Sequence, residues 1–96
     1  MSLAQIEYFV AVSETGHVGR AAEALRIAQP AVSRQIRNLE DELGARLFVR
    51  SARGMHLSHA GGVFLEHARA ILAQVEDARR AVQARESRGG VKSDAG

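Results

Sequence analysis

The stretch that decides the fold is Ala21–Ile36, which reads AAEALRIAQPAVSRQI. It is typical of two short helices joined by a tight turn at Ile27-Ala28. Pro30 falls in the first turn of the second helix, where a missing N–H loses no helical hydrogen bond. We expect a helix-turn-helix whose second helix packs on its own domain through one face and offers its polar face to a DNA major groove.

Two helices are expected in the N-terminal quarter of the chain. Ser2 and Gln5 have the spacing of a capping box, and apolar residues at helical intervals predict a first helix over about 3–14. Residues 15–17 end it. The first helix of the pair is then expected to begin at residue 19 or 20 and to end at 26.

The third helix is predicted over 29–43, where apolar residues recur at steps of four, three and four. Gly44 suits the left-handed residue that closes a helix. The apolar stripe predicted to be buried is Val32, Ile36, Leu39 and Leu43.

Residues 46–57 change to short β-prone runs on either side of 51–54. This pattern predicts a small hairpin. A hairpin directly after a helix-turn-helix is a wing, so the expected fold is mainly α: a winged helix-turn-helix with a three-helix core.

A fourth, long helix is expected over 59–85, capped by Ser58, and it would be about 40 Å long. Its apolar residues follow a heptad spacing, which serves either dimerisation or packing within the domain. The length favours a dimer. The domains expected are a DNA-binding domain (1–58), a dimerisation helix (59–85) and a disordered tail (86–96). The predicted dimer surface is Phe64, Ala68, Ile71, Leu72, Val75, Ala78 and Val82.

The composition excludes several classes of protein. The chain has 96 residues, of which 46% are hydrophobic, enough for one small domain. It contains no cysteine, which excludes disulfides and thiolate metal sites. We find no secretory signal and no apolar run near the roughly 18 residues of a membrane span.

Positive charge is concentrated around the helix pair. Residues 20–53 carry seven arginines and four acidic residues, whereas the whole chain has a net charge of only +2. Arginine makes two-pronged hydrogen bonds to phosphates and to guanine edges. This distribution favours a nucleic acid as the partner.

The sequence resembles the N-terminal DNA-binding domain of LysR-type transcriptional regulators. The resemblance covers about residues 2–85 without a gap and includes the run from Gln29 to Ile36. It implies a winged helix-turn-helix, an inverted-repeat operator and an antiparallel dimer through the linker helix. The matching positions are Ala21, Ala22, Leu25, Gln29–Ile36, Leu39, Glu40, Leu43, Gly44, Leu47, Phe48, Arg50, Arg53, Gly54, Leu57, Ser58, Ala60 and Gly61.

The resemblance also implies parts that this chain does not contain. Full-length members are mostly tetramers and carry a C-terminal domain that binds a small effector, so no cofactor is expected here. Two positions depart from the family pattern. Ala28 replaces the usual serine cap of the recognition helix, at an expected cost of about 0.5–2 kcal/mol. Gly19 stands where serine or threonine often caps the preceding helix.

Arg34 and Gln29 are the expected base readers, because arginine bridges guanine O6 and N7 and glutamine bridges adenine N6 and N7. Arg53 at the hairpin tip is expected to reach the minor groove. Arg37 either contacts the DNA backbone or pairs with Asp41. Arg50 either contacts phosphate or pairs with Glu40 or Glu42. The full set of predicted DNA contacts is Gln29, Pro30, Ser33, Arg34, Arg37, Arg50, Arg53 and Arg20.

We expect neither a metal site nor an enzyme. The four histidines are scattered without the spacing of paired ligands, and no acid–base constellation is evident. The predicted function is sequence-specific binding of double-stranded DNA by a dimeric bacterial transcription regulator, located in the cytoplasm at the nucleoid. The alternative is a winged-helix adaptor that dimerises without DNA.

Overall fold

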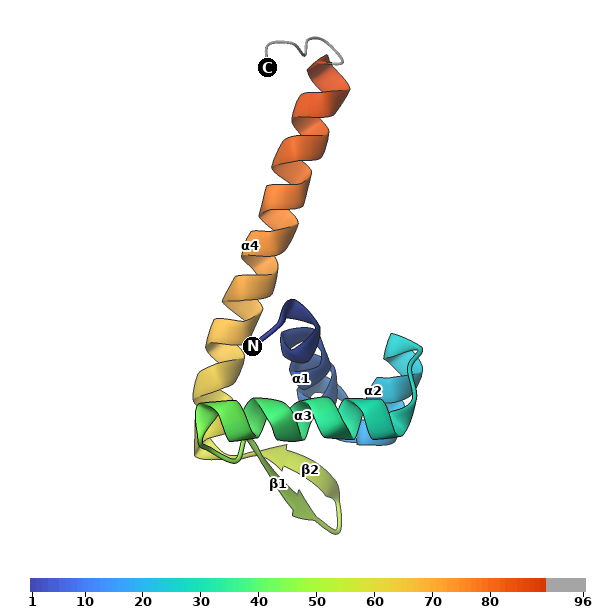
Figure 1. Cartoon of the computed structure of the whole chain (residues 1–96), viewed down its shortest axis with the longest axis vertical. Coiled ribbons are helices and arrows are strands. Elements are labelled where there is room, and N and C mark those ends of the chain that lie inside the picture. The colour runs from blue at the N-terminus through green and yellow to red at the C-terminus, as the bar shows by residue number, and fades with distance from the viewer. Residues whose placement is uncertain (90–96) are drawn as a thin grey trace.

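The computed structural model of the chain describes residues 1–89. A compact group of three helices and a hairpin stands at one end of a long helix, which projects away from the group (Figure 1). The elements in chain order are α1 (Leu3–Thr15), α2 (Val18–Leu25), α3 (Gln29–Leu43), β1 (Phe48–Ser51), β2 (Gly54–Leu57) and α4 (His59–Gly89).

Local signals set the ends of α1 as the sequence predicted. Ser2 Oγ accepts the Gln5 N–H, and the Gln5 carboxamide oxygen accepts the Ser2 N–H, both at 3.1 Å. These bonds satisfy two donors that the first helical turn leaves unpaired. The helix ends at Gly16, whose φ of 75° is left-handed, a conformation that glycine adopts without steric cost.

The start of α2 differs from the prediction. The helix begins at Val18, with His17 as its N-cap, and Gly19 lies inside the first turn. The His17 carbonyl accepts the Ala21 N–H at 3.0 Å, and Val18 is buried, so packing of Val18 draws the earlier residues into the helix. Arg26 closes the helix with a left-handed φ of 61°.

Helix α3 has its predicted bounds and end signals. Pro30 lies in the first turn, and Gly44 closes the helix with a φ of 67°. Ala28 is the N-cap and makes no side-chain capping bond. Its methyl group cannot accept the backbone N–H groups that a serine would.

The core lies where α1, α3, the wing and the start of α4 meet. Phe9 is its centre, with its ring centroid 5.3 Å from that of Phe48 and 4.9 Å from that of Phe64. These tilted and edge-on contacts join three elements that are distant in sequence. The other fully buried large side chains are Val12, Val32, Leu39 and Leu47.

The wing is an antiparallel hairpin with Phe48 opposite Leu57 and Ser51 opposite Gly54. It is tied to the rest of the domain by the Met55 N–H, which donates to the Gly16 carbonyl at 2.9 Å. A Cβ at Gly54 would lie 2.7 Å from that same carbonyl oxygen, so only glycine fits here. The wing therefore has a fixed orientation relative to the α1–α2 turn.

The long helix α4 begins as predicted. Ser58 Oγ accepts the Gly61 N–H at 2.9 Å and donates to the Arg46 carbonyl at 2.6 Å. The helix continues to Gly89, so the predicted tail begins at least four residues too early. Residues 86–88 contain no glycine or proline to end the helix. The rest of the predicted tail, 90–96, lies outside the described residues.

The residues of α4 that were predicted to form the dimer surface lie in two different environments. Ala68 is 0% exposed within the domain core, so its predicted place in the dimer surface is wrong. Phe64 and Leu72 pack against the same core and are half-buried there. The start of α4 thus shares one hydrophobic core with the elements that precede the predicted boundary at residue 58.

Candidate nucleic-acid interface

The outer face of α3 carries polar and basic side chains opposite the core. Val32, Ile36 and Leu39 are buried on the inner face. Because successive exposed positions recur every three to four residues, the predicted contact residues fall on one side of the helix. Ser33 is half-buried, and the exposed members are Gln29, Pro30, Arg34 and Arg37.

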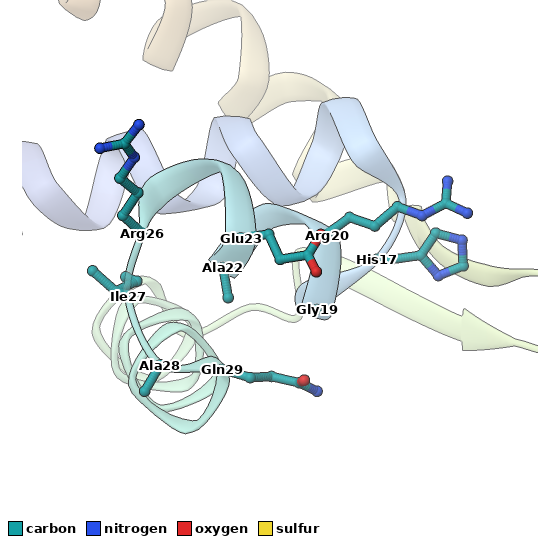
Figure 2. A pocket seen from close by; sticks show the side chains of 9 residues that line it. All are labelled: His17, Gly19, Arg20, Ala22, Glu23, Arg26, Ile27, Ala28 and Gln29. Carbon is teal, nitrogen blue, oxygen red and sulfur yellow. The ribbon is translucent and has the colours of Figure 1, made fainter.

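An open hollow of about 900 Å³ runs along α2 and the turn after it to the first residue of α3. It brings together Arg20 and Gln29, which are nine residues apart in the sequence. His17 also lines the hollow, and its side chain extends to the same side as those of Arg20 and Gln29 (Figure 2). Arg26 extends to the opposite side. This hollow therefore joins a predicted base reader to a predicted phosphate contact.

A second groove, of about 160 Å³, lies between α3 and the wing. It collects three of the predicted contact residues, Ser33, Arg37 and Arg50. Arg46 lines it as well and is exposed, although the sequence prediction omitted it. Arg46 precedes β1 in an irregular segment, so no helical or strand period indicated where it would point.

The predicted ion pairs of these arginines are not formed within residues 1–89. Glu42 pairs with the N-terminal amine at 2.8 Å, and the other ion pairs involve Glu14 and Glu76. Arg37 and Arg50 are in none of them. Their guanidinium groups therefore remain available for an anionic partner such as DNA phosphate.

Arg53 lies at the tip of the wing and lines neither hollow. Its backbone N–H donates to Ser51 Oγ at 3.2 Å, and His56 Nε2 lies 2.9 Å from the same oxygen. Ser51 thus organises the turn that presents Arg53. Sequence reasoning missed this role of Ser51 and His56, because it depends on the register of the hairpin.

The far half of α4 offers a second candidate surface. Ile71 is 36% exposed and Val82 is 63% exposed, and Ala78 is exposed beside them. Val75 is half-buried. These four residues keep the heptad spacing beyond the point where the domain core ends.

Two other kinds of site find no support in the part of the chain that the structure describes. No three His, Asp or Glu side chains within it gather in a group that could hold a metal ion. None of its helices combines the length and the apolar character that crossing a membrane requires.

The family model described as bacterial regulatory helix-turn-helix protein, lysR family, matches residues 3–62. The HTH-type transcriptional regulator TfdT of Cupriavidus pinatubonensis is 50% identical over 84 residues, which are 88% of this chain and 37% of that protein. The nitrogen assimilation regulatory protein nac of Escherichia coli is 45% identical over 82 residues, 85% of this chain and 27% of that protein. The chain thus spans well under half the length of these relatives.

Two solved structures share this fold over most of the chain. The crystal structure of a CbnR_DBD–DNA complex has a TM-score of 0.82 at 42% identity and covers 88% of this chain and 97% of that one. The BenM_DBD/catB site 1 DNA complex has a TM-score of 0.84 at 39% identity and covers 88% of this chain and 94% of that one. The predicted winged helix-turn-helix fold is confirmed.

Proposed function

Because the chain belongs to the LysR family of bacterial regulatory helix-turn-helix proteins, we propose that it binds double-stranded DNA sequence-specifically as part of a transcription regulator. The observation that carries the proposal is the exposed face of α3. Gln29, Arg34 and Arg37 stand there, opposite a buried stripe, and no carboxylate of the described residues forms an ion pair with either arginine.

In this proposal α3 enters the major groove with its N-terminal half toward the bases. Arg34 and Gln29 read base edges. Pro30 and Ser33 lie between them in sequence and contact bases or adjacent phosphates. This part of the helix is the part that meets base edges in helix-turn-helix proteins.

The two hollows flanking α3 supply contacts to the DNA backbone. Arg20 contacts phosphate from the side of α2. Arg37, Arg46 and Arg50 contact phosphate from the groove beside the wing. Phosphate contacts fix the register of the domain without carrying sequence information. Arg53 at the wing tip reaches toward the minor groove.

Dimerisation through the far half of α4 is part of the same proposal. The proposed dimer surface is smaller than the predicted one. It consists of Ile71, Val75, Ala78 and Val82, next to the exposed parts of Phe64 and Leu72. A two-fold dimer places two recognition helices on an inverted repeat. For the full-length protein we propose a tetramer in the bacterial cytoplasm, with a small-molecule effector held outside this chain.

The experiment that tests the function is selection of this chain on a random duplex pool at about physiological salt, followed by sequencing. Enrichment of a two-fold symmetric motif, with half-sites about one helical turn apart, is the expected result. Binding without enrichment would contradict sequence reading by this domain. No binding even at low salt would favour a winged-helix adaptor without DNA.

A further inference from the structure

The imidazole ring of His17 lies between the helix pair and the wing. His17 lines the open hollow that ends at Gln29, and its side chain extends to the same side as that of Arg20 (Figure 2). A Cβ placed on Gly54 of the wing would lie 3.0 Å from His17 Cε1 and 3.4 Å from His17 Nδ1. One edge of the ring therefore lies beside the wing, while the residue as a whole is exposed.

The fold holds the backbone of His17 but makes no polar use of its side chain. The His17 N–H donates to Thr15 Oγ1 at 3.3 Å, and the His17 carbonyl accepts the Ala21 N–H at 3.0 Å. His17 is the N-cap of α2, yet its side chain makes no capping bond. Within residues 1–89 neither ring nitrogen has a hydrogen-bond or ion-pair partner. Both nitrogens are therefore open to an external group.

The proposed docking on DNA brings this ring to the sugar–phosphate backbone. In that docking α3 enters the major groove and Arg53 at the wing tip reaches the minor groove. Neighbouring grooves of a duplex are separated by one sugar–phosphate strand. His17 lines the hollow that leads to the start of α3, and it also lies beside Gly54, the residue after Arg53. It therefore lies where that strand passes.

The charges around His17 do not already hold a proton on its ring. Charged or titratable side chains close to His17 or Gly54 along the chain are Glu14 on α1, Arg20 and Glu23 on α2, and Arg53 and His56 on the wing. Arg20 opposes a positive charge on the ring, whereas Glu23, which lines the same hollow, favours one. In the described part of the chain, none of these residues forms an ion pair with His17.

We propose that His17 is a titratable contact to the DNA backbone, which adds a positive charge to the interface when its ring is protonated. Histidine changes its charge between about pH 5 and 8, and a neighbouring phosphate favours the charged form. Binding to DNA thus takes up a proton at this residue, and the affinity rises as the pH falls. The inference rests on the proposed function, because it uses the docking in which α3 enters the major groove.

The test is the salt dependence of binding to the selected operator at pH 5.5 and at pH 8. One phosphate contact contributes about 0.9 to the slope of log affinity against log salt. For the unaltered chain we expect the slope at pH 5.5 to be steeper by about 0.9 for each half-site occupied. An unrelated duplex should show the same increase, because phosphate contacts carry no sequence information.

Two variants separate the charge of His17 from its bulk. His17→Gln should keep the shallower slope at both pH values, because glutamine donates a hydrogen bond without carrying a charge. His17→Lys should keep the steeper slope at both, because lysine stays charged. A merely structural role of position 17 would not produce these opposite results. Thermal unfolding at each pH checks that the fold is kept.

His56→Gln and His67→Gln are the matched controls, since each replaces another exposed histidine with the same amide. His56 lies on the wing, where its Nε2 is 2.9 Å from Ser51 Oγ, and His67 lies on α4. Both variants should keep the full change of slope between the two pH values. A change of slope that disappears in His56→Gln and persists in His17→Gln would overturn the inference and assign the titrating contact to the wing.

Two further outcomes distinguish failure of the inference from failure of the proposed function. If the chain selects an operator but its slope is the same at both pH values, His17 makes no charged contact and the proposed function stands. If the chain shows no sequence preference in the selection, the proposed function is wrong, and the docking on which this inference rests is lost with it.

Discussion

The side-chain carboxylate of Glu40 accepts the backbone N–H of Leu47 at 2.8 Å. This bond joins the last turns of α3 to the segment that leads into the wing. It also answers a question that the sequence left open, because Glu40 is engaged by the backbone and forms no ion pair with Arg50. Position 40 is thus structural, although it lines the groove beside the arginines.

We expect Glu40→Ala to lower the free energy of unfolding by about 1–3 kcal/mol, because the N–H of the buried Leu47 loses a charged acceptor. Chemical denaturation measures the loss. Glu40→Gln is the control, since its carboxamide oxygen still accepts the bond, and it should cost less than about 1 kcal/mol. If both variants lose the same free energy of unfolding, the negative charge of Glu40 and not its hydrogen bond to Leu47 would account for the loss.

The neighbouring glycines of α4 should respond to alanine in opposite ways. A Cβ at Gly61 would collide with the Leu47 carbonyl oxygen and lie 3.0 Å from its carbonyl carbon, whereas Gly62 has open space. We expect Gly61→Ala to destabilise the fold by about 3 kcal/mol and Gly62→Ala to stabilise it by about 0.5–1 kcal/mol. Thermal unfolding of the pair checks this, and similar melting temperatures would contradict it.

Arg34→Ala should cost about 1–3 kcal/mol in binding to the selected operator and relax the preference at one base pair. The reason is the loss of a two-pronged contact to a base edge. Competition binding with operators altered one base pair at a time gives the measurement. A uniform loss on every sequence would show that Arg34 contacts only phosphate.

Arg46→Ala should weaken binding to specific and unrelated duplexes alike, because its place in the groove suits a phosphate. Each phosphate contact contributes about 0.9 to the slope of log affinity against log salt. The slope should therefore fall by about that amount. Arg80→Ala, on the far part of α4 and paired with Glu76 at 3.5 Å, is the control that should leave the slope unchanged.

Val75→Asp should convert the dimer to monomers, because it places a charge in the apolar surface between Ile71 and Val82. Sedimentation velocity measures the change. Ala73→Asp adds the same charge at an exposed position on another face of α4 and should leave the dimer intact. If the dimer survives Val75→Asp, this surface is not the dimer interface. If both variants lose the dimer, the added net charge and not its position would be the cause.

The sequence predicted those elements whose ends depend on neighbouring residues. Ser2 with Gln5, Pro30 and Gly44 mark their helix ends through bonds and dihedral angles within one turn, so α1 and α3 were predicted within a residue. The start of α2 was not, because His17 provides no side-chain cap. Burial of Val18, a tertiary effect, decided it.

Periodicity also could not separate two uses of one apolar stripe. Ala68 and Val82 follow the same heptad spacing, yet Ala68 is buried in the core and Val82 is exposed. The difference is the position of α1, which covers only the first turns of α4. In the candidate site, the helical period predicted which arginines of α3 are exposed. The positions of Arg46 and Ser51 were not predicted, because they depend on how the hairpin folds back.

The junction of the wing and α4 has a mechanical consequence. The Ser58 N–H donates to the Leu47 carbonyl at 2.9 Å, the Ser58 hydroxyl donates to the Arg46 carbonyl, and Gly61 lies against Leu47. No slack linker separates the two elements. The junction is therefore rigid, and we expect a rotation imposed at the far end of α4, about 45 Å away along its 31 residues, to turn the wing as well, because no flexible segment at the junction can absorb it.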